Sequence, residues 1–434
     1  MPSLSEAEEL RRNRKHAEAL PTFEEAWKAR HHPDVGWRYA NCLRNVGRPA
    51  EALAVCEQIL EAEPDHLQAK REAVWAVYAS AFRPAIERSD LPAAVAAARR
   101  MEALGADGFA LKRIALALPR LAKQHGDWNA VLEWTGKVEP RELDPNPRSD
   151  RDRVYLPERL LWYFARVRAL LELGLLSEVL ELVENAERDF PGQKDLQRWK
   201  AMALARQGDV AAALEIMRRV SAREKDAYIH DTLAEIAEQA GNADLAFAAT
   251  CRALAAPGKI PVKIRSIERL ARLAADRGDA ETAVLNVRLA LAVREREGWK
   301  IRFELEDLAS RAESMLEKPL PELPYDQLLE RCRRTWQSAA EVPDGEGDGT
   351  VEAVPEGKSF AFIRLEDGRD VFTPLEVLPP ALRKRGTRVH VRWKLSWDRK
   401  KQRDSLRAIG IDLPGSSHRQ PHRESPGDGT RTDS

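Results

Sequence analysis

The sequence predicts a mainly α-helical protein: an α-solenoid of helix-turn-helix repeats, followed by a small C-terminal five-stranded antiparallel β-barrel. Two observations lead to this fold class. Segments within residues 4–316 share one pattern of small residues and turn residues at helical spacing. From residue 350 onward this spacing is replaced by short runs in which apolar and polar residues alternate, as they do in strands.

Length and composition limit the possible classes of protein. The 434 residues are too many for one ordinary core, so we expect several domains or an elongated repeat array. Lysine plus arginine and aspartate plus glutamate both number 70, so the net charge of the whole chain predicts no partner. No apolar stretch approaches the roughly 20 residues of a membrane-spanning helix. Four scattered cysteines without metal-ligand spacing favour reduced thiols, and we therefore expect a cytoplasmic protein with no membrane partner.

The repeated unit consists of a small residue, a turn about seven residues later, and an alanine about five residues after the turn. Its clearest copy contains Ala40, Gly47 and Ala52. Glycine adopts the turn conformation that other residues reach only with strain, and small residues let two helices approach closely. We expect turns of this kind, some of them in weaker copies, at Arg14, Gly47, Ser89, Gly126, Gly174, Gly208, Gly241 and Gly278.

One such helix pair cannot bury its apolar face alone, so neighbouring pairs must stack. The pattern, with 34 residues between Gly174 and Gly208, resembles the tetratricopeptide repeat family over about residues 4–316. The spacing stretches at Asp144–Arg153, which indicates either an insertion or a break between two runs of repeats, residues 1–143 and 154–316. We expect a protein or peptide partner in the groove of this array.

The remaining boundaries follow from composition. Residues 317–342 contain a polar helix, Tyr325–Ala340, that could cap the array. Residues 343–349 (PDGEGDG) have no apolar side chain, which predicts a flexible linker before a barrel at residues 350–413. Residues 414–434 are almost devoid of apolar side chains and are expected to be disordered.

The barrel segment GTVEAVPEGKSFAFIRLEDGRDVF resembles the opening strands of a cold-shock domain. The matching residues are Gly349, Val351, Lys358, Phe360, Phe362, Ile363, Asp367, Gly368, Asp370, Val371 and Phe372. The resemblance covers only about residues 349–413. It implies an OB-fold barrel that binds RNA or single-stranded DNA.

The residue types support that implication. Phe360 and Phe362 alternate on one strand and Phe372 lies on the next, so their rings could stack on unpaired bases, at roughly 1–3 kcal/mol per base. Lysines and arginines dominate residues 383–407 and would attract phosphates without sequence preference. The candidate nucleic-acid-binding residues are Lys358, Phe360, Phe362, Arg364, Phe372, Arg388, Arg392, Trp393, Lys394, Trp397, Lys400 and Lys401.

Some residues depart from the cold-shock pattern. Ala353 and Val354 occupy the positions of an aromatic pair, and Pro374 replaces a histidine. At least two stacking partners are therefore absent, which predicts weaker affinity. Trp393 and Trp397, in the basic fourth strand and its hairpin loop, are candidates to replace them.

The sequence contains no arrangement of nucleophile, histidine and acid that predicts catalysis. The Gly357-Lys358-Ser359 run lacks the upstream glycine of a phosphate-binding loop. We therefore predict a non-enzymatic nucleic-acid-binding adaptor, without cofactor or metal. Two alternatives stay open: a protein-interaction scaffold that binds no nucleic acid, and a regulatory subunit of a nucleic-acid-processing enzyme. The residues do not distinguish RNA from DNA.

Overall fold

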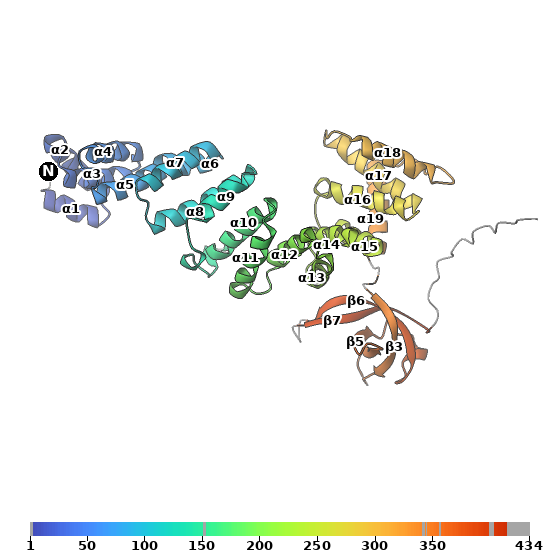
Figure 1. Cartoon of the computed structure of the whole chain (residues 1–434). Helices are drawn as coiled ribbons and strands as arrows, with labels where there is room; N and C mark the ends of the chain where they lie inside the picture. Colours follow the sequence, from blue (N-terminus) through green and yellow to red (C-terminus); the bar gives the residue numbers. More distant parts are fainter. Residues whose placement is uncertain are drawn as a thin grey trace, which may run out of the picture. The chain divides into compact units, whose positions relative to one another are not determined.

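A computed structural model of the chain describes residues 3–150, 153–340, 343, 345–355, 357–398 and 403–414. These residues form a helical array and a closed barrel, as the sequence predicts (Figure 1). The chain divides into two compact units, residues 1–203 and 204–434. Helix α12 (Lys194–Gln207) contains the division.

The first unit consists of stacked helices with one short hairpin. Its elements are α1 (Leu4–Arg12), α2 (His16–Arg30), α3 (Pro33–Asn45), α4 (Pro49–Ala62), α5 (Leu67–Val77), η1 (Tyr78–Phe82), α6 (Arg83–Glu87), α7 (Leu91–Ala103), α8 (Gly108–Gln124), α9 (Trp128–Thr135), η2 (Pro140–Glu142), β1 (Arg148–Asp150), β2 (Arg153–Tyr155), α10 (Glu158–Glu172), α11 (Leu176–Asp189) and α12.

The second unit continues with helices and ends in the barrel. Its elements are α13 (Val210–Arg223), α14 (Ala227–Gln239), α15 (Ala243–Ala255), η3 (Ile260–Lys263), α16 (Ile264–Asp276), α17 (Ala280–Arg296), α18 (Phe303–Ser314), α19 (Tyr325–Ala339), β3 (Gly345–Ala353), β4 (Phe360–Leu365), β5 (Asp370–Pro374), η4 (Pro380–Leu382), β6 (Arg388–Asp398) and β7 (Arg403–Asp412).

All of the predicted turns adopt a left-handed backbone conformation. The φ angles are 61° at Arg14, 86° at Gly47, 57° at Ser89, 71° at Gly126, 74° at Gly174, 97° at Gly208, 70° at Gly241 and 78° at Gly278. The weaker copies at Arg14 and Ser89 thus reverse the chain in the same way without glycine. A non-glycine residue in this conformation is strained, by roughly 1–2 kcal/mol.

In five of these turns the next residue caps the following helix. Its side-chain oxygen accepts a hydrogen bond, 2.9–3.1 Å long, from the backbone N–H three residues later. Such caps satisfy an otherwise unpaired donor and contribute about 1 kcal/mol each. The capping residues are Asp90, Asp127, Asp209, Asn242 and Asp279.

The repeat period also appears as polar contacts between neighbouring helix pairs. Arg166 donates to the carbonyl of Leu132 at 3.1 Å, and Arg269 donates to Glu235 at 2.8 Å, in both cases across 34 residues. Small side chains fill the contacts between helices, and Ala40 is completely buried. The sequence period therefore corresponds to one stacking step of the array.

The expected insertion or break at Asp144–Arg153 is an insertion, formed largely by the β1–β2 hairpin. The flanking helices pack against each other, because the Trp162 indole donates to the carbonyl of Thr135 at 2.8 Å. The array thus continues from α9 to α10. The division between the compact units lies later than the expected boundary between residues 143 and 154.

Helix α19 ends the helical part of the second unit, close to the expected bounds. Trp336 is completely buried, and its indole donates to Asn286 of α17 at 2.8 Å. Cys332 and Leu328 of the same helix are also buried. One face of α19 therefore covers α17.

The barrel closes in the strand order β3-β4-β5-β7-β6. Four of its pairings are antiparallel, but β5 and β7 are parallel, with Val371 opposite Leu406. The barrel is thus mixed, whereas we expected antiparallel strands throughout. Its interior contains the inward residues of the alternating strands, among them Val351, Ala361, Ile363, Val371, Val389, Val391, Trp393 and Leu406.

Of the segment expected as a flexible linker, residues 343–349, residues 345–349 form the start of strand β3. Gly345 pairs with Trp393 and Gly349 with Val389. A Cβ at Gly345 would lie 2.9 Å from the Trp393 indole, so glycine is required there for close packing. Glycine-rich composition is common to linkers and to such crowded strands, which explains the error.

Two other expectations concern the chain ends and the membrane. Of the tail expected to be disordered, residues 414–434, all but Pro414 lie outside the described residues. Among the described helices, none combines the length and apolar character needed to cross a membrane.

All four cysteines are free and buried. Burial raises the pKa of Cys42, Cys251 and Cys332 to about 12, and it also raises the pKa of Cys56. A thiol with a raised pKa remains protonated and unreactive at pH 8. We therefore expect negligible labelling of the native protein by a disulfide reagent at pH 8, and labelling of all four thiols in denaturant. Rapid labelling of the native chain would contradict this burial.

The strained turns allow a matched test of stability. Replacing Ser89 by glycine should raise the free energy of unfolding by about 0.5–1 kcal/mol, because glycine adopts the left-handed conformation without a Cβ clash. The reverse change Gly126→Ser should lower the free energy of unfolding by about 1 kcal/mol, because serine is strained in the left-handed conformation. Nothing lies within 4 Å of the added Cβ, so a steric clash does not contribute. Urea unfolding followed by circular dichroism measures both. An equal change in the free energy of unfolding for the two substitutions would contradict an origin in backbone strain.

Candidate nucleic-acid interface and peptide groove

The three predicted phenylalanines form one cluster on the outer face of the barrel. Along β4, Ala361 and Ile363 point into the core, so Phe360 and Phe362 point outward. Phe372 of β5 lies opposite Phe362. The ring centroids are 5.3–6.0 Å apart, and each side chain is partly buried. We call these three residues the aromatic face.

A row of outward side chains crosses the barrel through the aromatic face. The register places Lys394 of β6 opposite Arg407 of β7, Arg407 opposite Phe372, and Phe372 opposite Phe362. The Arg407 guanidinium carbon lies 5.9 Å from the centre of the Phe372 ring. Two aromatic rings are thus followed directly by two cations. Arg407 was not among our candidate site residues, although its alternation with buried Leu406 and Ala408 indicates an outward position.

Several of the predicted basic residues form ion pairs with acidic side chains. Arg364 pairs with Asp370 on the neighbouring strand, and Arg388 pairs with Glu366 at 2.7 Å. The hydrogen bond to Asp370 raises the pKa of Arg364 above its ordinary value. Lys358 is exposed in the loop before β4. Arg407 and Lys358 have no ion pair with any residue that the structure describes.

Two basic residues of β6, Arg392 and Lys394, lie on the far side of β7 from the aromatic strands, next to the end of α19. The Lys394 ammonium donates to the carbonyl of Ala340, at the end of α19, at 2.7 Å. Arg392 pairs with Asp412 at 3.2 Å. These two cations therefore face the junction between the barrel and α19.

The tryptophan expectation is wrong for Trp393, which was a candidate for stacking. It is only 7% exposed and fills the barrel core beside Gly345 and Gly347. The alternation of β6 explains why Trp393 is buried, because Val389, Val391 and Trp393 share the inner side of the strand. Trp397 lies in β6, but its side chain is outside the described residues, as are Lys400 and Lys401.

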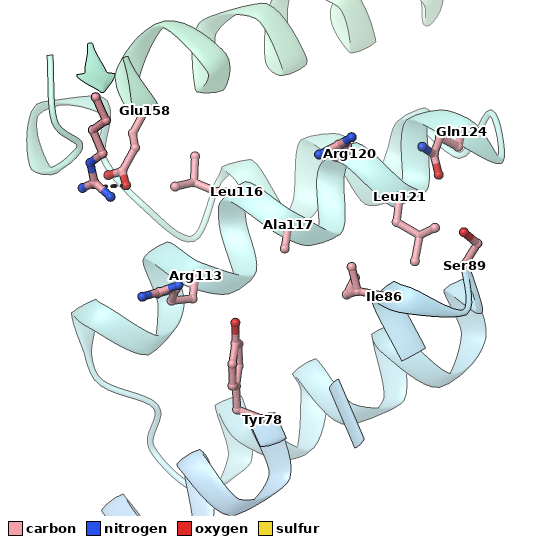
Figure 2. A pocket seen from close by; sticks show the side chains of 11 residues that line it. Tyr78, Ile86, Ser89, Arg113, Leu116, Ala117, Arg120, Leu121, Gln124 and Glu158 are labelled. Carbon is pink, nitrogen blue, oxygen red and sulfur yellow. Dashed lines mark ion pairs between the residues drawn. The ribbon is translucent and has the colours of Figure 1, made fainter. Parts of the chain in front are cut away.

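A groove in the first unit is a candidate binding site of the helical array. It has a volume of about 530 Å³ and lies between α8 and the segment from η1 to Ser89 (Figure 2). Its apolar lining consists of Tyr78, Ile86, Leu116, Ala117 and Leu121, and its polar lining of Ser89, Arg113, Arg120, Gln124, Arg148 and Glu158. We call it the α8 groove.

A local change in helix geometry shapes one wall of the groove. Pro84 has no N–H to donate, and the preceding residues form a π-helical turn in which Arg83 donates to the carbonyl of Tyr78. Figure 2 shows Tyr78 pointing from this turn towards α8. Turns of this kind frequently occur at functional sites. Pro84 in the sequence is the signal that could have indicated this site.

The arginines of the α8 groove differ in their partners. Arg148 pairs with Glu158 at 2.9 Å (Figure 2). Arg113 and Arg120 are exposed, and neither forms an ion pair with a described residue. They lie two turns apart on α8 with Leu116 and Ala117 between them. The groove therefore offers an apolar floor between two available positive charges.

Comparisons with known proteins support the helical part of this description. A tetratricopeptide repeat family model matches residues 10–79. This stretch of the array is similar to tetratricopeptide repeats. A second model, a domain of unknown function (DUF7017), matches residues 196–323. Neither of these matches reaches the barrel, whose resemblance to cold-shock domains rests on its motif. A search of curated proteins finds no match.

Several solved structures are similar to the chain, among them proteins described as tetratricopeptide repeat proteins. A tetratricopeptide repeat protein from Parabacteroides merdae is 10% identical, with 61% of this chain and 95% of that chain covered and a TM-score of 0.30. A thermophilic TPR protein of Thermus thermophilus is 18% identical, with 54% and 97% covered and a TM-score of 0.30. A human IFIT1 dimer with m7Gppp-AAAA is 12% identical, with 77% and 79% covered and a TM-score of 0.36.

Proposed function

We propose that the protein is a non-enzymatic adaptor that binds single-stranded nucleic acid on the aromatic face and a protein partner in the α8 groove. One observation carries the first part: three adjacent aromatic rings lie on the outside of the barrel, next to cations. Free, buried cysteines are consistent with a cytoplasmic protein.

Stacking and charge act together on such a surface. Base stacking on an aromatic ring contributes roughly 1–3 kcal/mol and tolerates any base. Lys358 and Arg407 are positioned to contact phosphates beside the rings. The exposed pairs Arg364–Asp370 and Arg388–Glu366 contribute little stability, so a phosphate can replace the carboxylate as the partner of each arginine.

The α8 groove favours a peptide rather than a nucleic acid. Its floor is formed by aliphatic side chains, among them Ile86, Leu116 and Leu121, and would bury an apolar side chain. Arg113 and Arg120 on either side would pair with carboxylates. We therefore infer a peptide segment in which an apolar residue is flanked by acidic residues.

Replacing the rings of the aromatic face tests the nucleic-acid proposal. Phe362→Leu with Phe372→Leu keeps the surface apolar but removes two flat rings, so affinity for a labelled single-stranded oligonucleotide should fall about a hundredfold. Phe362→Tyr should retain binding, because tyrosine also stacks. Fluorescence anisotropy measures affinity, and thermal unfolding shows whether the barrel remains folded.

The control is Phe303→Ala, which removes an aromatic side chain that is 76% exposed on α18. It should leave affinity unchanged. A wild-type chain that binds neither RNA nor DNA oligonucleotides at low salt would contradict the proposal and favour the protein-interaction scaffold.

Charge reversal tests the peptide groove. Arg113→Glu with Arg120→Glu should weaken binding of a labelled peptide, a leucine flanked by aspartates, by tenfold or more, because attraction becomes repulsion. Lys112→Glu with Lys123→Glu, on the same helix but outside the groove, is the matched control. Isothermal titration calorimetry measures both. Equal losses in the two proteins would show that only overall charge matters and would exclude the groove.

A further inference from the structure

A second hollow adjoins the aromatic face, between the barrel and the end of α19. This cleft has a volume of about 560 Å³. Ser338 of α19 and Pro343 form one side, and Arg392, Lys394 and Arg407 contribute three cations from the barrel. No aspartate or glutamate is among the described residues that line it. Such a lining favours an anionic ligand.

Two backbone features position Arg392 in this cleft. The β6–β7 ladder has an irregularity after Arg392, where Ile409 is the extra residue of β7. The neighbouring Gly410 has no Cβ, and a Cβ there would lie 2.6 Å from the Arg392 guanidinium. Bulges commonly redirect a side chain, and this one is combined with the glycine that gives the guanidinium room.

The guanidinium of Arg392 has an N–H donor without a hydrogen-bond partner. It pairs with Asp412 through Nη2, and its Nε is buried without a hydrogen-bond partner. An unsatisfied buried donor is destabilising. A ligand that draws the guanidinium into new hydrogen bonds would offset part of this destabilisation.

Like charges also lie close together in the cleft. Lys394 and Arg407 are direct neighbours across β6 and β7, and like charges in this position repel each other. Lys394 donates to the neutral carbonyl of Ala340. Arg407 has no ion pair with a described residue and is shared between the cleft and the Phe372 ring. The cleft is thus continuous with the aromatic face.

We propose that this cleft binds a backbone phosphate of the same strand whose bases stack on the aromatic face. Helix α19 of the array then forms one wall of the nucleic-acid site. The inference rests on the proposed function, because it concerns the path of the same ligand. It adds a contribution from the repeat array that the barrel motif does not imply.

The test adds one negative charge to the helical wall of the cleft in the full-length chain. Ser338 lines the cleft, so Ser338→Glu places a negative charge in it. Gln337→Glu adds the same charge to the neighbouring exposed residue of α19, outside the lining. With a labelled oligo-uridine and low salt, Ser338→Glu should weaken binding about tenfold and Gln337→Glu less than twofold. Equal affinities of the two variants would overturn the inference.

Removing a phosphate contact provides a second readout. Arg392→Gln should reduce the slope of log affinity against log salt by about 0.7, the effect of one phosphate contact on a single strand. An unchanged slope would contradict the inference. If the two leucine substitutions on the aromatic face abolish binding while Ser338→Glu has no effect, only the cleft fails. If the wild-type chain binds no oligonucleotide, the proposed function fails as well.

Discussion

The left-handed turn between two helices is the constraint on which the array depends. It reverses the chain within a few residues, and the Asp or Asn that often follows begins the next helix with a side-chain cap. Each of these turns closes one helix pair, and neighbouring pairs contact each other through side chains. Contacts such as Arg269 to Glu235, across 34 residues, are the result. The turn thus determines which side chains of successive repeats can meet.

In the barrel, strand alternation has the corresponding role. The same two-residue period that buries Ala361 and Ile363 places Phe360 and Phe362 outside. The alternation of β4 therefore both fills the core and places the rings on the outside. The rings also contact one another, so each is partly buried before any ligand binds. This arrangement preorganises a stacking surface, which reduces the entropy that a ligand must lose on binding.

The sequence predicted the structure best where a feature depends on residues close by in the chain. A turn at Gly47 or Ser89 depends on its own backbone and on the helices beside it, so the repeat pattern was sufficient. Trp393 was misjudged although its alternation with Val389 and Val391 places it on the inner side of β6. The pairing with Gly345 of β3, which makes room for its ring, is not contained in any short motif. The partners of Arg364 and Lys394 likewise come from another strand and from α19. Glycine composition alone could not separate a flexible linker from the crowded start of β3.

The position of β7 between β5 and β6 in the closed barrel has a consequence for assembly. Strand β7 pairs with both β5 and β6, so each of those strands has an unpaired edge until β7 is in place. Unpaired edges can accept a strand from another molecule. A copy whose β7 arrives late is therefore open to exchange of this strand with a second copy. Domain-swapped dimers joined through residues 403–412 are the form of misassembly that this topology favours.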